Sequence, residues 1–480
     1  MRYEYGTSGF RYHHKKLKQI SMKIGMALAI LSNKKNKYIG VMITASHNQF
    51  QDNGVKIIDY NGEMINENDE SFLVNYVNNT TINIPNYNAK IIIGMDTRES
   101  SPEIKESIIS GVRIIDSNSL IIDLGLTTTP QLHYLTKLQN ECSNLIENSI
   151  YYNSYFNNHQ LNLNHPVIID CANGVGFHIL DKIKHEFNLN EIILKNTKTY
   201  AHHLLNLDCG SDYVQNNHII PFNLLINNQL CCSLDGDADR IVFYFLNDDK
   251  FYLLDGDSIS ALIAYFICKY IDISKIDIAV IHTSYSSINF IKYINTLGIK
   301  TVCTATGVKN LHKEANKYDI GIYFEYNGHG TVLIKNSKNI QKLSKIEQNY
   351  VYILDKLFSS LIGDAIYDLF AVIYIIRELN IKYIDWYNLY DKNYTKNFKI
   401  KVKNKNIFKT NNTENKLTDP IGIQEYLEKI MKKYNNVYTF IRPSGTEDII
   451  RLHIQADTEE IIEHIFNDIT SILINEFDVF

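Results

Sequence analysis

The sequence predicts a protein of the α/β class with several domains. Its 480 residues exceed what one hydrophobic core usually organises, so we expect three or four domains. Hydrophobic residues make up 45% of the chain, enough to fill several cores. Short apolar runs that end in polar loops alternate with helix-like segments, and this alternation is typical of parallel sheets covered by helices.

The predicted elements follow one another as repeated strand–helix–strand units. The first has a helix over 17–32, strands at 41–43 and 55–58 joined through a turn at 52–54, then a strand at 91–95, a helix over 102–112, a strand at 119–124 and a loop at 125–130. The second opens at 167–170 and continues through a helix over 179–187, the third opens at 278–281, and the polar, basic stretch 391–409 is interpreted as a solvated strand or linker.

Net charge and cysteine content indicate which kind of partner the protein binds and in which compartment it is found. The 48 basic and 53 acidic residues leave a net charge of −5, which argues against nucleic acid or an anionic membrane and favours a small molecule. The seven cysteines are scattered and form no Cys-x-x-Cys pair, so we expect neither disulfides nor a thiolate metal site. Apolar runs are too short to cross a bilayer and the first residues lack a signal-like segment, so a cytoplasmic location is expected.

An acidic cluster follows the apolar run 230–234. Asp235, Asp237 and Asp239 stand on alternate residues, and a strand-like backbone would turn all three carboxylates to one side. The small Gly236 and Ala238 would leave the approach to them open. Carboxylates without His or Cys suit a hard divalent cation, which in an open site is usually Mg²⁺ holding a phosphate, with the next residue, an arginine, as a phosphate partner.

Three other interpretations of this cluster compete with a magnesium site. A solvated acidic turn is common. An EF-hand that began at Asp235 would need Gly at its sixth and Glu at its twelfth position, where Arg240 and Leu246 stand. A haloacid-dehalogenase-like phosphatase also places its nucleophilic Asp after an apolar strand. Residues 281–284 and 363–368 are weakly similar to the other motifs of that fold.

Ser46 is a better nucleophile than any aspartate of that cluster. It follows the apolar run 41–43, with His47 beside it and Lys56 shortly after. A hydroxyl at a strand end, near a cation site and a lysine, suits a covalently phosphorylated nucleophile. The alternative is a cap made by Ser46 or Asn48.

Three further loops carry groups that bind anions or sugars. The small-residue loop 6–11 ends in Arg11, and the loop 442–448, followed by Arg451, resembles a phosphate cradle because bidentate arginines and a Gly-rich turn suit that role. The run 322–331 predicts a strand that ends in a sugar-binding turn, in which Glu325 and Asn327 share a face by alternation and His329 follows.

Together these motifs resemble the α-D-phosphohexomutase superfamily over nearly the whole chain. The run 44–48 is similar to its phosphoserine loop, 235–240 to its Mg²⁺ loop, 325–331 to its sugar-binding loop, and 442–446 with Arg451 to its phosphate-binding loop. Asn327, together with the runs 306–309 and 125–134, resembles the branch that acts on N-acetylglucosamine phosphates. Gln49 and Tyr326 depart from the family pattern.

The resemblance implies four domains around a central cleft, three of related α/β build and a C-terminal α+β domain, at 1–160, 161–258, 259–385 and 386–480. It implies interconversion of the 6- and 1-phosphates of N-acetylglucosamine for UDP-N-acetylglucosamine synthesis, through a phosphoserine and a 1,6-bisphosphate. One Mg²⁺ per chain and a hexose 1,6-bisphosphate activator are expected. Phosphoglucomutase or phosphomannomutase activity, a phosphatase and a non-catalytic relative remain alternatives; intact Ser46 and the three aspartates argue against the last.

The resemblance also assigns roles to individual residues. The expected catalytic residues are Ser46, Lys56, Arg240, His329 and Arg11, with His329 as the candidate general base. The expected substrate-binding residues are Thr306, Gly307, Lys309, Glu325, Tyr326, Asn327, Arg442, Pro443, Ser444, Gly445, Thr446 and Arg451. The expected metal ligands are Ser46, Asp235, Asp237 and Asp239. A sugar phosphate is the expected partner, without nucleic acid or membrane, and monomer and homodimer both stay open.

Overall fold

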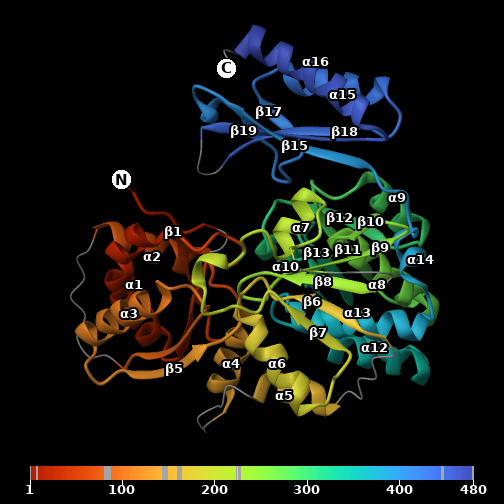
Figure 1. Ribbon diagram of the computed structural model, residues 1–480. Helices are drawn as coiled ribbons and strands as arrows, with labels where there is room; N and C mark the ends of the chain where they lie inside the picture. The colour runs from red at the N-terminus through yellow and green to blue at the C-terminus, as the bar shows by residue number, and fades with distance from the viewer. Residues whose placement is uncertain are drawn as a thin grey trace. The chain divides into compact units, whose positions relative to one another are not determined.

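The computed structural model describes residues 2–6, 9–79, 88–142, 150–158, 165–222, 224, 229–444 and 448–477 (Figure 1). It divides into two compact units. The first comprises Met1–Gly256, Asn327–Val332 and Tyr352–Tyr383, and the second comprises Asp257–Tyr326, Leu333–Val351 and Ile384–Phe480.

The first sheet of unit 1 has the strand order β1-β3-β2-β4-β5. Its elements are β1 (Phe10–His13), α1 (His14–Lys35), β2 (Tyr38–Ile43), β3 (Asp52–Ile58), α2 (Glu67–Asn79), β4 (Lys90–Met95), α3 (Ser101–Ile115), β5 (Leu120–Leu126) and α4 (Thr129–Glu141). The strands β2, β4 and β5 run parallel, so their carboxyl ends meet at one edge. The predicted helices and strands are confirmed. However, residues 52–54, where a turn was expected, belong to β3, and residues 125–126, where a loop was expected, belong to β5.

The second sheet of unit 1 has the order β10-β9-β8-β6-β7. Its elements are α5 (Ile150–Asn158), β6 (Val167–Asp170), α6 (Gly176–Glu186), β7 (Ile192–Lys195), η1 (His202–Leu204), α7 (Ser211–Asn217), β8 (Leu230–Leu234), β9 (Ile241–Asn247) and β10 (Lys250–Leu254). The strand β8 is buried along its whole length and pairs parallel with β6. Both strands therefore end at the same edge, which is where ligands usually bind in open α/β sheets.

The third sheet has the order β12-β11-β13-β14, and β11 runs parallel to both β12 and β13. The elements of this region are α8 (Gly256–Tyr270), η2 (Ile273–Lys275), β11 (Ile278–Thr283), α9 (Ile288–Thr296), β12 (Lys300–Thr304), α10 (Val308–Ala315), β13 (Ile320–Phe324), β14 (Gly330–Ile334), α11 (Lys338–Gln341), α12 (Lys345–Leu357), α13 (Ala365–Leu379) and α14 (Tyr383–Tyr387). The third strand–helix–strand unit is thus confirmed.

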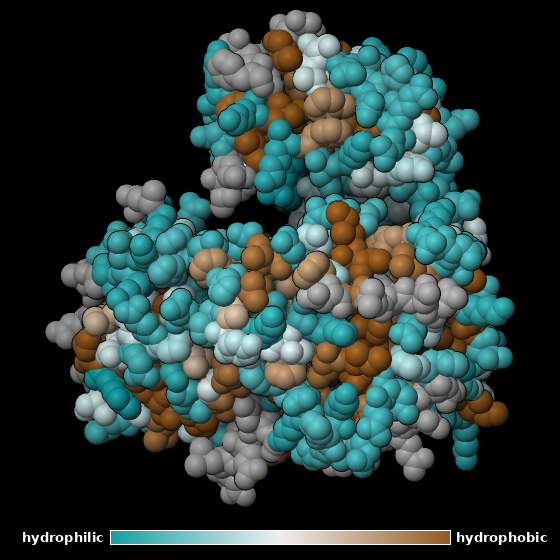
Figure 2. Space-filling model, in the orientation of Figure 1, coloured by the Kyte–Doolittle hydropathy of each residue, from teal (hydrophilic) through white to brown (hydrophobic). Residues whose placement is uncertain are grey.

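The C-terminal part of unit 2 is an antiparallel sheet of order β15-β19-β18 with two helices. It comprises β15 (Tyr394–Lys401), η3 (Lys405–Ile407), β16 (Lys409–Thr410), β17 (Leu417–Asp419), α15 (Ile423–Lys433), β18 (Tyr438–Pro443), β19 (Ile449–Ala456) and α16 (Glu459–Phe477). Helix α15 buries Ile423, Leu427 and Ile430 on one side, and its visible outer face is mostly hydrophilic (Figure 2). The polar stretch 391–409 contains the strand β15, most of whose residues keep contact with solvent, as expected.

The α/β class with several domains is therefore confirmed, while the four predicted domain boundaries stay a prediction. Within the described residues, no helix has both the length and the apolar character needed to cross a membrane.

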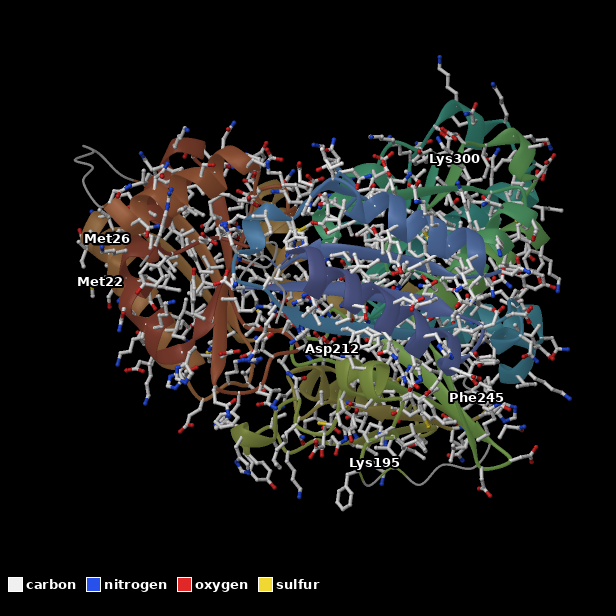
Figure 3. All side chains as sticks on the ribbon, turned by 90° about the horizontal axis from the view of Figure 1, so that it is seen from above. Met22, Met26, Lys195, Asp212, Phe245 and Lys300 are labelled. Atoms are coloured by element: carbon white, nitrogen blue, oxygen red, sulfur yellow. The ribbon has the colours of Figure 1, made fainter. Side chains whose placement is uncertain are left out.

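Helices α1 and α3 approach each other through two glycines (Figure 1). A Cβ on Gly25 would lie 2.0 Å from the backbone oxygen of Ile108, and a Cβ on Gly111 would lie 2.0 Å from that of Met22. Met22 and its neighbour Met26 are labelled on α1 in Figure 3. The obstructing atoms belong to the backbone, so a larger residue at either position would force the two helices apart.

We expect Gly111→Ala to lower the stability of the protein by about 1–2 kcal/mol. The steric cost of overpacking outweighs the helix preference of alanine over glycine, which is worth about 1 kcal/mol. The thermal unfolding midpoint would be compared with that of Ser110→Ala, which changes an exposed neighbour on the same helix. Equal midpoints for the two variants would contradict the close approach.

Candidate active site

The loop that carries Ser46 starts where β2 ends, at Ile43. Ser46 has a φ of 51°, in the left-handed region, and its backbone N–H donates to the Thr44 hydroxyl at 2.8 Å. The Thr44 hydroxyl in turn donates to Asp96, at the end of β4, at 2.8 Å. This tight turn directs the buried Ser46 hydroxyl to Asp235, and the distance from Oγ to Oδ2 is 2.6 Å.

The three carboxylates of the second loop converge as predicted, but for a different reason. Strand β8 ends at Leu234, and the residues after it form a turn in which the Ala238 N–H donates to the Asp235 carbonyl at 3.2 Å. Ala238 has a φ of 57°, and the N–H of Asp239 donates to Asp235 Oδ1 at 3.1 Å. The turn, and not alternation along a strand, brings one oxygen of Asp235, Asp237 and Asp239 within 4.8 Å of one another.

Gly236 allows the two loops to touch. A Cβ at this position would lie 2.7 Å from the backbone oxygen of Ser46. The expectation that Gly236 keeps an open approach is therefore wrong, because the Ser46 loop occupies the space beside it. A side chain here would push Ser46 away from the carboxylates.

Lysine charge balances the buried carboxylates. The Lys56 ammonium on β3 lies 2.9 Å from Asp237 Oδ2 and 2.9 Å from Asp239 Oδ2. Burial lowers the pKa of Lys56, but the two carboxylates outweigh burial and hold the pKa above its ordinary value. Burial raises the pKa of Asp235 well above its usual range, and the negative charges of Asp239 and Asp237 add to that effect.

The donor set fits a hard divalent cation. Asp237 Oδ1 and Asp239 Oδ1 are buried and accept no hydrogen bond within the described part of the chain. Unsatisfied buried carboxylate oxygens are costly unless a cation or a donor meets them. Three carboxylates with a nearby hydroxyl are the oxygen ligands that Mg²⁺ prefers.

Thr129, at the first turn of α4, also holds the cluster. Its hydroxyl donates to Asp237 Oδ2 at 2.6 Å, and its N–H donates to the Asp237 carbonyl at 3.2 Å. Sequence reasoning missed this contact and assigned the residue to a loop. The signal was present, because a threonine run followed by Pro130 at the carboxyl end of a predicted strand is typical of a helix start.

Arg98 anchors the Ser46 loop from the carboxyl end of β4 and was also missed. Its fully buried guanidinium pairs with Asp96 at 2.8 Å and donates to the carbonyls of Asn48 at 2.6 Å and Ser46 at 3.2 Å. Asn206 donates to the same two carbonyls, at 3.0 and 2.8 Å. The position of Arg98 at a predicted strand end was the available signal, whereas nothing in the sequence marks Asn206.

Arg240 lies beside the carboxylates, as expected, and it also pairs with another acid. Its Nη1 donates to Asp212 on α7 at 2.8 Å, while its Nε is 3.8 Å from both Asp235 and Asp239 (Asp212 is labelled in Figure 3). His47 Nε2 lies 3.7 Å from the same Asp212. Burial, followed by the charge of Arg240, holds the pKa of His47 well below its usual range, so this imidazole is neutral.

Arg11 reaches the Ser46 loop from β1. Its Nη1 donates to Asn48 Oδ1 at 3.2 Å, while Nε and Nη2 are buried without a hydrogen-bond partner in the described residues. Burial, and then the charge of Arg240, lower its pKa to about 10, so it stays charged near neutral pH. These two donors suit an anion such as a phosphate. Thr7 and Ser8 of the same loop lie outside the described residues.

His329, the candidate general base, lies beside the carboxylates, a position that was not predicted. Its Nδ1 lies 3.7 Å from Asp239 Oδ1, and burial lowers its pKa to about 4. Gly328, with a φ of 85°, lets the turn lie directly against β9, because a Cβ there would be 1.8 Å from the Ile241 oxygen. Asn327 Oδ1 accepts the His329 N–H at 3.3 Å. A neutral imidazole in this position can accept a proton.

The remaining predicted residues lie in unit 2, where the structure pairs some of them. Glu325 Oε1 accepts the N–H of Gly307 at 3.1 Å. Strand β13 ends at Phe324, so Glu325 and Asn327 lie beyond the strand. The prediction that strand alternation places them on one face therefore does not apply. Lys309 lies in α10, directly after the Thr306–Gly307 turn, and Tyr326 follows Glu325 in the turn after β13.

The predicted phosphate cradle lies on two paired strands. Arg442 of β18 stands opposite Arg451 of β19, with Pro443 next along β18. Two guanidinium groups on adjacent strands can bind one anion together. Ser444 donates its N–H to the Ile449 carbonyl at 2.9 Å. Gly445 and Thr446 lie outside the described residues.

Unit 1 thus holds a buried hydroxyl bonded to a carboxylate of a cation-binding cluster, with lysine and arginine charge around it. This combination is typical of enzymes that transfer a phosphoryl group through a covalent serine intermediate.

Comparison with known families agrees with this chemistry. Models of the phosphoacetylglucosamine mutase AMG1 match residues 139–242 (domain II) and 255–381 (domain III). Models of phosphoglucomutase/phosphomannomutase match 22–84 and 71–151 (alpha/beta/alpha domain I) and 399–472 (C-terminal domain).

Several individual proteins are similar to this chain over nearly their full length. The chain is 36% identical to phosphoacetylglucosamine mutase of Candida albicans, covering 98% of this chain and 96% of the relative, and 33% identical to that of Homo sapiens, covering 97% and 93%. Its structure resembles an N-acetylglucosamine-phosphate mutase in the substrate complex (TM-score 0.90, 35% identity, 98% and 96% coverage). It also resembles the Aspergillus fumigatus N-acetylphosphoglucosamine mutase in complex with GlcNAc-6P and magnesium (TM-score 0.90, 30% identity, 98% and 95% coverage).

The fold is that of an α-D-phosphohexomutase, an enzyme of the isomerase class. Within that superfamily, the chain belongs to the phosphoacetylglucosamine mutase family.

We expect Arg98→Met to lower the free energy of unfolding by about 3 kcal/mol. The variant leaves Asp96 buried without its guanidinium partner and removes the donors that hold the Ser46 loop. Urea unfolding would measure the change against Arg113→Met, in which an exposed arginine of α3 is replaced. A midpoint equal to that of the control would contradict the anchoring role.

Proposed function

We propose that the chain interconverts N-acetylglucosamine 6-phosphate and N-acetylglucosamine 1-phosphate through phosphorylated Ser46 and a 1,6-bisphosphate intermediate. The observation that carries the proposal is the 2.6 Å bond between the Ser46 hydroxyl and Asp235 of the carboxylate cluster. The names of the relatives support the substrate, as does the neighbouring structure in complex with GlcNAc-6P and magnesium. The route would supply UDP-N-acetylglucosamine synthesis, in the cytoplasm.

Ser46, Asp235, Asp237 and Asp239 would hold one Mg²⁺ per chain. When bound, the ion supplies positive charge that offsets the charge of the transferring phosphoryl group. A hexose 1,6-bisphosphate would phosphorylate Ser46 at the start; a neighbouring structure, of a variant of the Aspergillus fumigatus enzyme, is in complex with glucose 1,6-bisphosphate.

Residues of the chain surround the reacting oxygen with compensating charge. In the first step the bond between phosphorus and the Ser46 oxygen breaks and leaves its electron pair on that oxygen. A bond forms from phosphorus to the oxygen of the free sugar hydroxyl, which loses its proton. His329 would take that proton, because its Nε2 is buried and has no hydrogen-bond partner in the described residues. Lys56, Arg11 and Arg240 stabilise the charge on the phosphoryl oxygens.

The second step returns a phosphoryl group to the serine. After the bisphosphate changes orientation, the bond from phosphorus to its other sugar oxygen breaks and the Ser46 oxygen bonds to phosphorus. The released sugar oxygen takes the proton that His329 holds from the first step. The same cradle must therefore accept either end of the sugar. Arg442, Pro443, Ser444, Gly445, Thr446 and Arg451 would hold the phosphate that is not reacting, and Thr306, Gly307, Lys309, Glu325, Tyr326 and Asn327 would hold the sugar.

A phosphoglucomutase or phosphomannomutase is the second candidate, because the models that match the first and last domains carry that name. A haloacid-dehalogenase-like phosphatase is disfavoured by the hydrogen bonds of Asp235. Its Oδ2 is engaged by Ser46, and its Oδ1 accepts the N–H groups of Asp239 and Arg240, at 3.1 and 3.3 Å. Both oxygens of Asp235 thus accept hydrogen bonds, which makes this carboxylate a poorer nucleophile than the Ser46 hydroxyl.

A coupled assay with the 6-phosphates of N-acetylglucosamine, glucose and mannose tests the proposal. We expect the highest kcat/KM for N-acetylglucosamine 6-phosphate, with ester phosphate conserved. Preference for glucose or mannose would support the second candidate, and release of inorganic phosphate in step with substrate loss would indicate a phosphatase.

Ser46→Ala is expected to abolish nearly all turnover, because it removes the oxygen that carries the phosphoryl group. Peptide mass spectrometry of the wild-type protein, treated with a hexose 1,6-bisphosphate, should locate phosphate on Ser46. Ser110→Ala should retain full activity. Phosphate found on Asp235 would contradict the assignment.

Asp237→Asn should reduce kcat by about 100-fold or more while the protein stays folded. The amide keeps an oxygen that can accept the Thr129 hydroxyl but loses the charge that binds the cation. Activity would be titrated with Mg²⁺, alongside Asp248→Asn, which removes the same charge from an exposed turn. Full activity of the wild-type enzyme in excess EDTA would refute the metal assignment.

A further inference from the structure

An acidic residue in the loop between β16 and β17 contacts two groups of unit 2 that are predicted to bind the substrate. Glu414 Oε2 accepts Arg442 Nη1 at 3.3 Å and the backbone N–H of Thr306 at 3.3 Å. Arg442 belongs to the proposed phosphate cradle, and Thr306 belongs to the proposed sugar-binding turn. One carboxylate therefore joins two groups that lie more than 100 residues apart in sequence.

The backbone at Glu414 is strained for this residue type. Its φ of 57° lies in the left-handed region, which favours glycine or asparagine. The loop nevertheless holds this conformation firmly, since the Glu414 N–H donates to the Asn411 carbonyl at 3.0 Å and Ser284 donates to the Thr413 carbonyl at 2.8 Å. A glutamate kept at such a position points to a role for its carboxylate.

Arg442 is oriented from a second side. Its Nε donates to the Tyr285 hydroxyl at 2.8 Å, and its guanidinium lies 5.3 Å from the centre of the Tyr285 ring. The guanidinium therefore has support that does not depend on Glu414. The pair with Glu414 stays accessible to solvent, because the side chains are 17% and 31% exposed for Arg442 and Glu414. A dissolved anion can reach Arg442 and replace the carboxylate.

We propose that Glu414 competes with the substrate phosphate for Arg442, and that its displacement frees the Thr306 N–H for the sugar. The inference rests on the proposed function, because it assigns Arg442 to phosphate binding. A phosphate dianion beside the carboxylate would be repelled by it, so both do not occupy Arg442 together. Binding of phosphate to Arg442 on β18 thereby makes the Thr306 N–H available to the sugar.

Whether removal of the Glu414 charge strengthens or weakens phosphate binding distinguishes this competing role from a purely structural one. Glu414→Gln keeps the size of the side chain and removes the competing charge, so phosphate binding becomes tighter. If Glu414 served only to position Arg442, the same variant would weaken binding or leave it unchanged. Since partly exposed ion pairs are weak, the expected gain is about two- to fivefold.

Isothermal titration of the full-length protein with N-acetylglucosamine 6-phosphate, and separately with inorganic phosphate, measures this gain. Glu414→Gln should lower Kd for both ligands by that factor. Glu460→Gln, which removes the same charge from the exposed face of α16, should bind both like the wild type. Arg442→Ala should raise Kd for both.

Each other result has a definite meaning. Weakened or unchanged binding by Glu414→Gln, with Arg442→Ala still impaired, overturns the competition and leaves the proposed function standing. Unchanged binding by Arg442→Ala removes Arg442 from the cradle and overturns the competition as well. Failure of the wild-type protein to bind or convert the sugar phosphate refutes the proposed function, and with it this inference.

Discussion

Burial of three carboxylates within 4.8 Å of one another is the constraint on which the structure of unit 1 depends. Like charges in a medium of low dielectric repel strongly, so the cluster exists only where other segments supply compensating groups. Lys56 comes from β3, Thr129 from α4 and the Ser46 hydroxyl from the loop after β2. Two sheets must therefore present their carboxyl ends to each other for the site to form.

The position of Ser46, the proposed nucleophile, depends on contacts of the loop backbone more than on its own side chain. Ser46 adopts a left-handed conformation that is costly for a serine, and its loop is held by donors from Arg98 and Asn206. Gly236 lets the loop approach the carboxylates closely. A transferred phosphoryl group must be met in one geometry, and these rigid supports provide it before substrate arrives.

The two units handle charge differently. In unit 1, buried acids and bases neutralise one another around the Ser46 hydroxyl. In unit 2, Arg442 remains within reach of solvent and pairs with Glu414 on a loop. Fixed charges suit the proposed site of phosphoryl transfer. The proposed phosphate cradle would have to release and regain a phosphate, and ion pairs of moderate strength suit that role.

The sequence by itself determined the α/β class, the order of the strands and helices, and the main groups of the site. Apolar runs ending in polar loops mark strand ends, and Ser46 and the aspartate cluster lie beside such ends, where local pattern carries the information. Only the tertiary structure showed that a turn gathers the aspartates, and that Arg98 and Asn206 hold the Ser46 loop. The turn is local, but alternating polar residues after a strand do not distinguish it from a continued strand. The contacts of Arg98 and Asn206 join segments separated by tens to more than 100 residues, and no local periodicity encodes which side chain meets which backbone carbonyl.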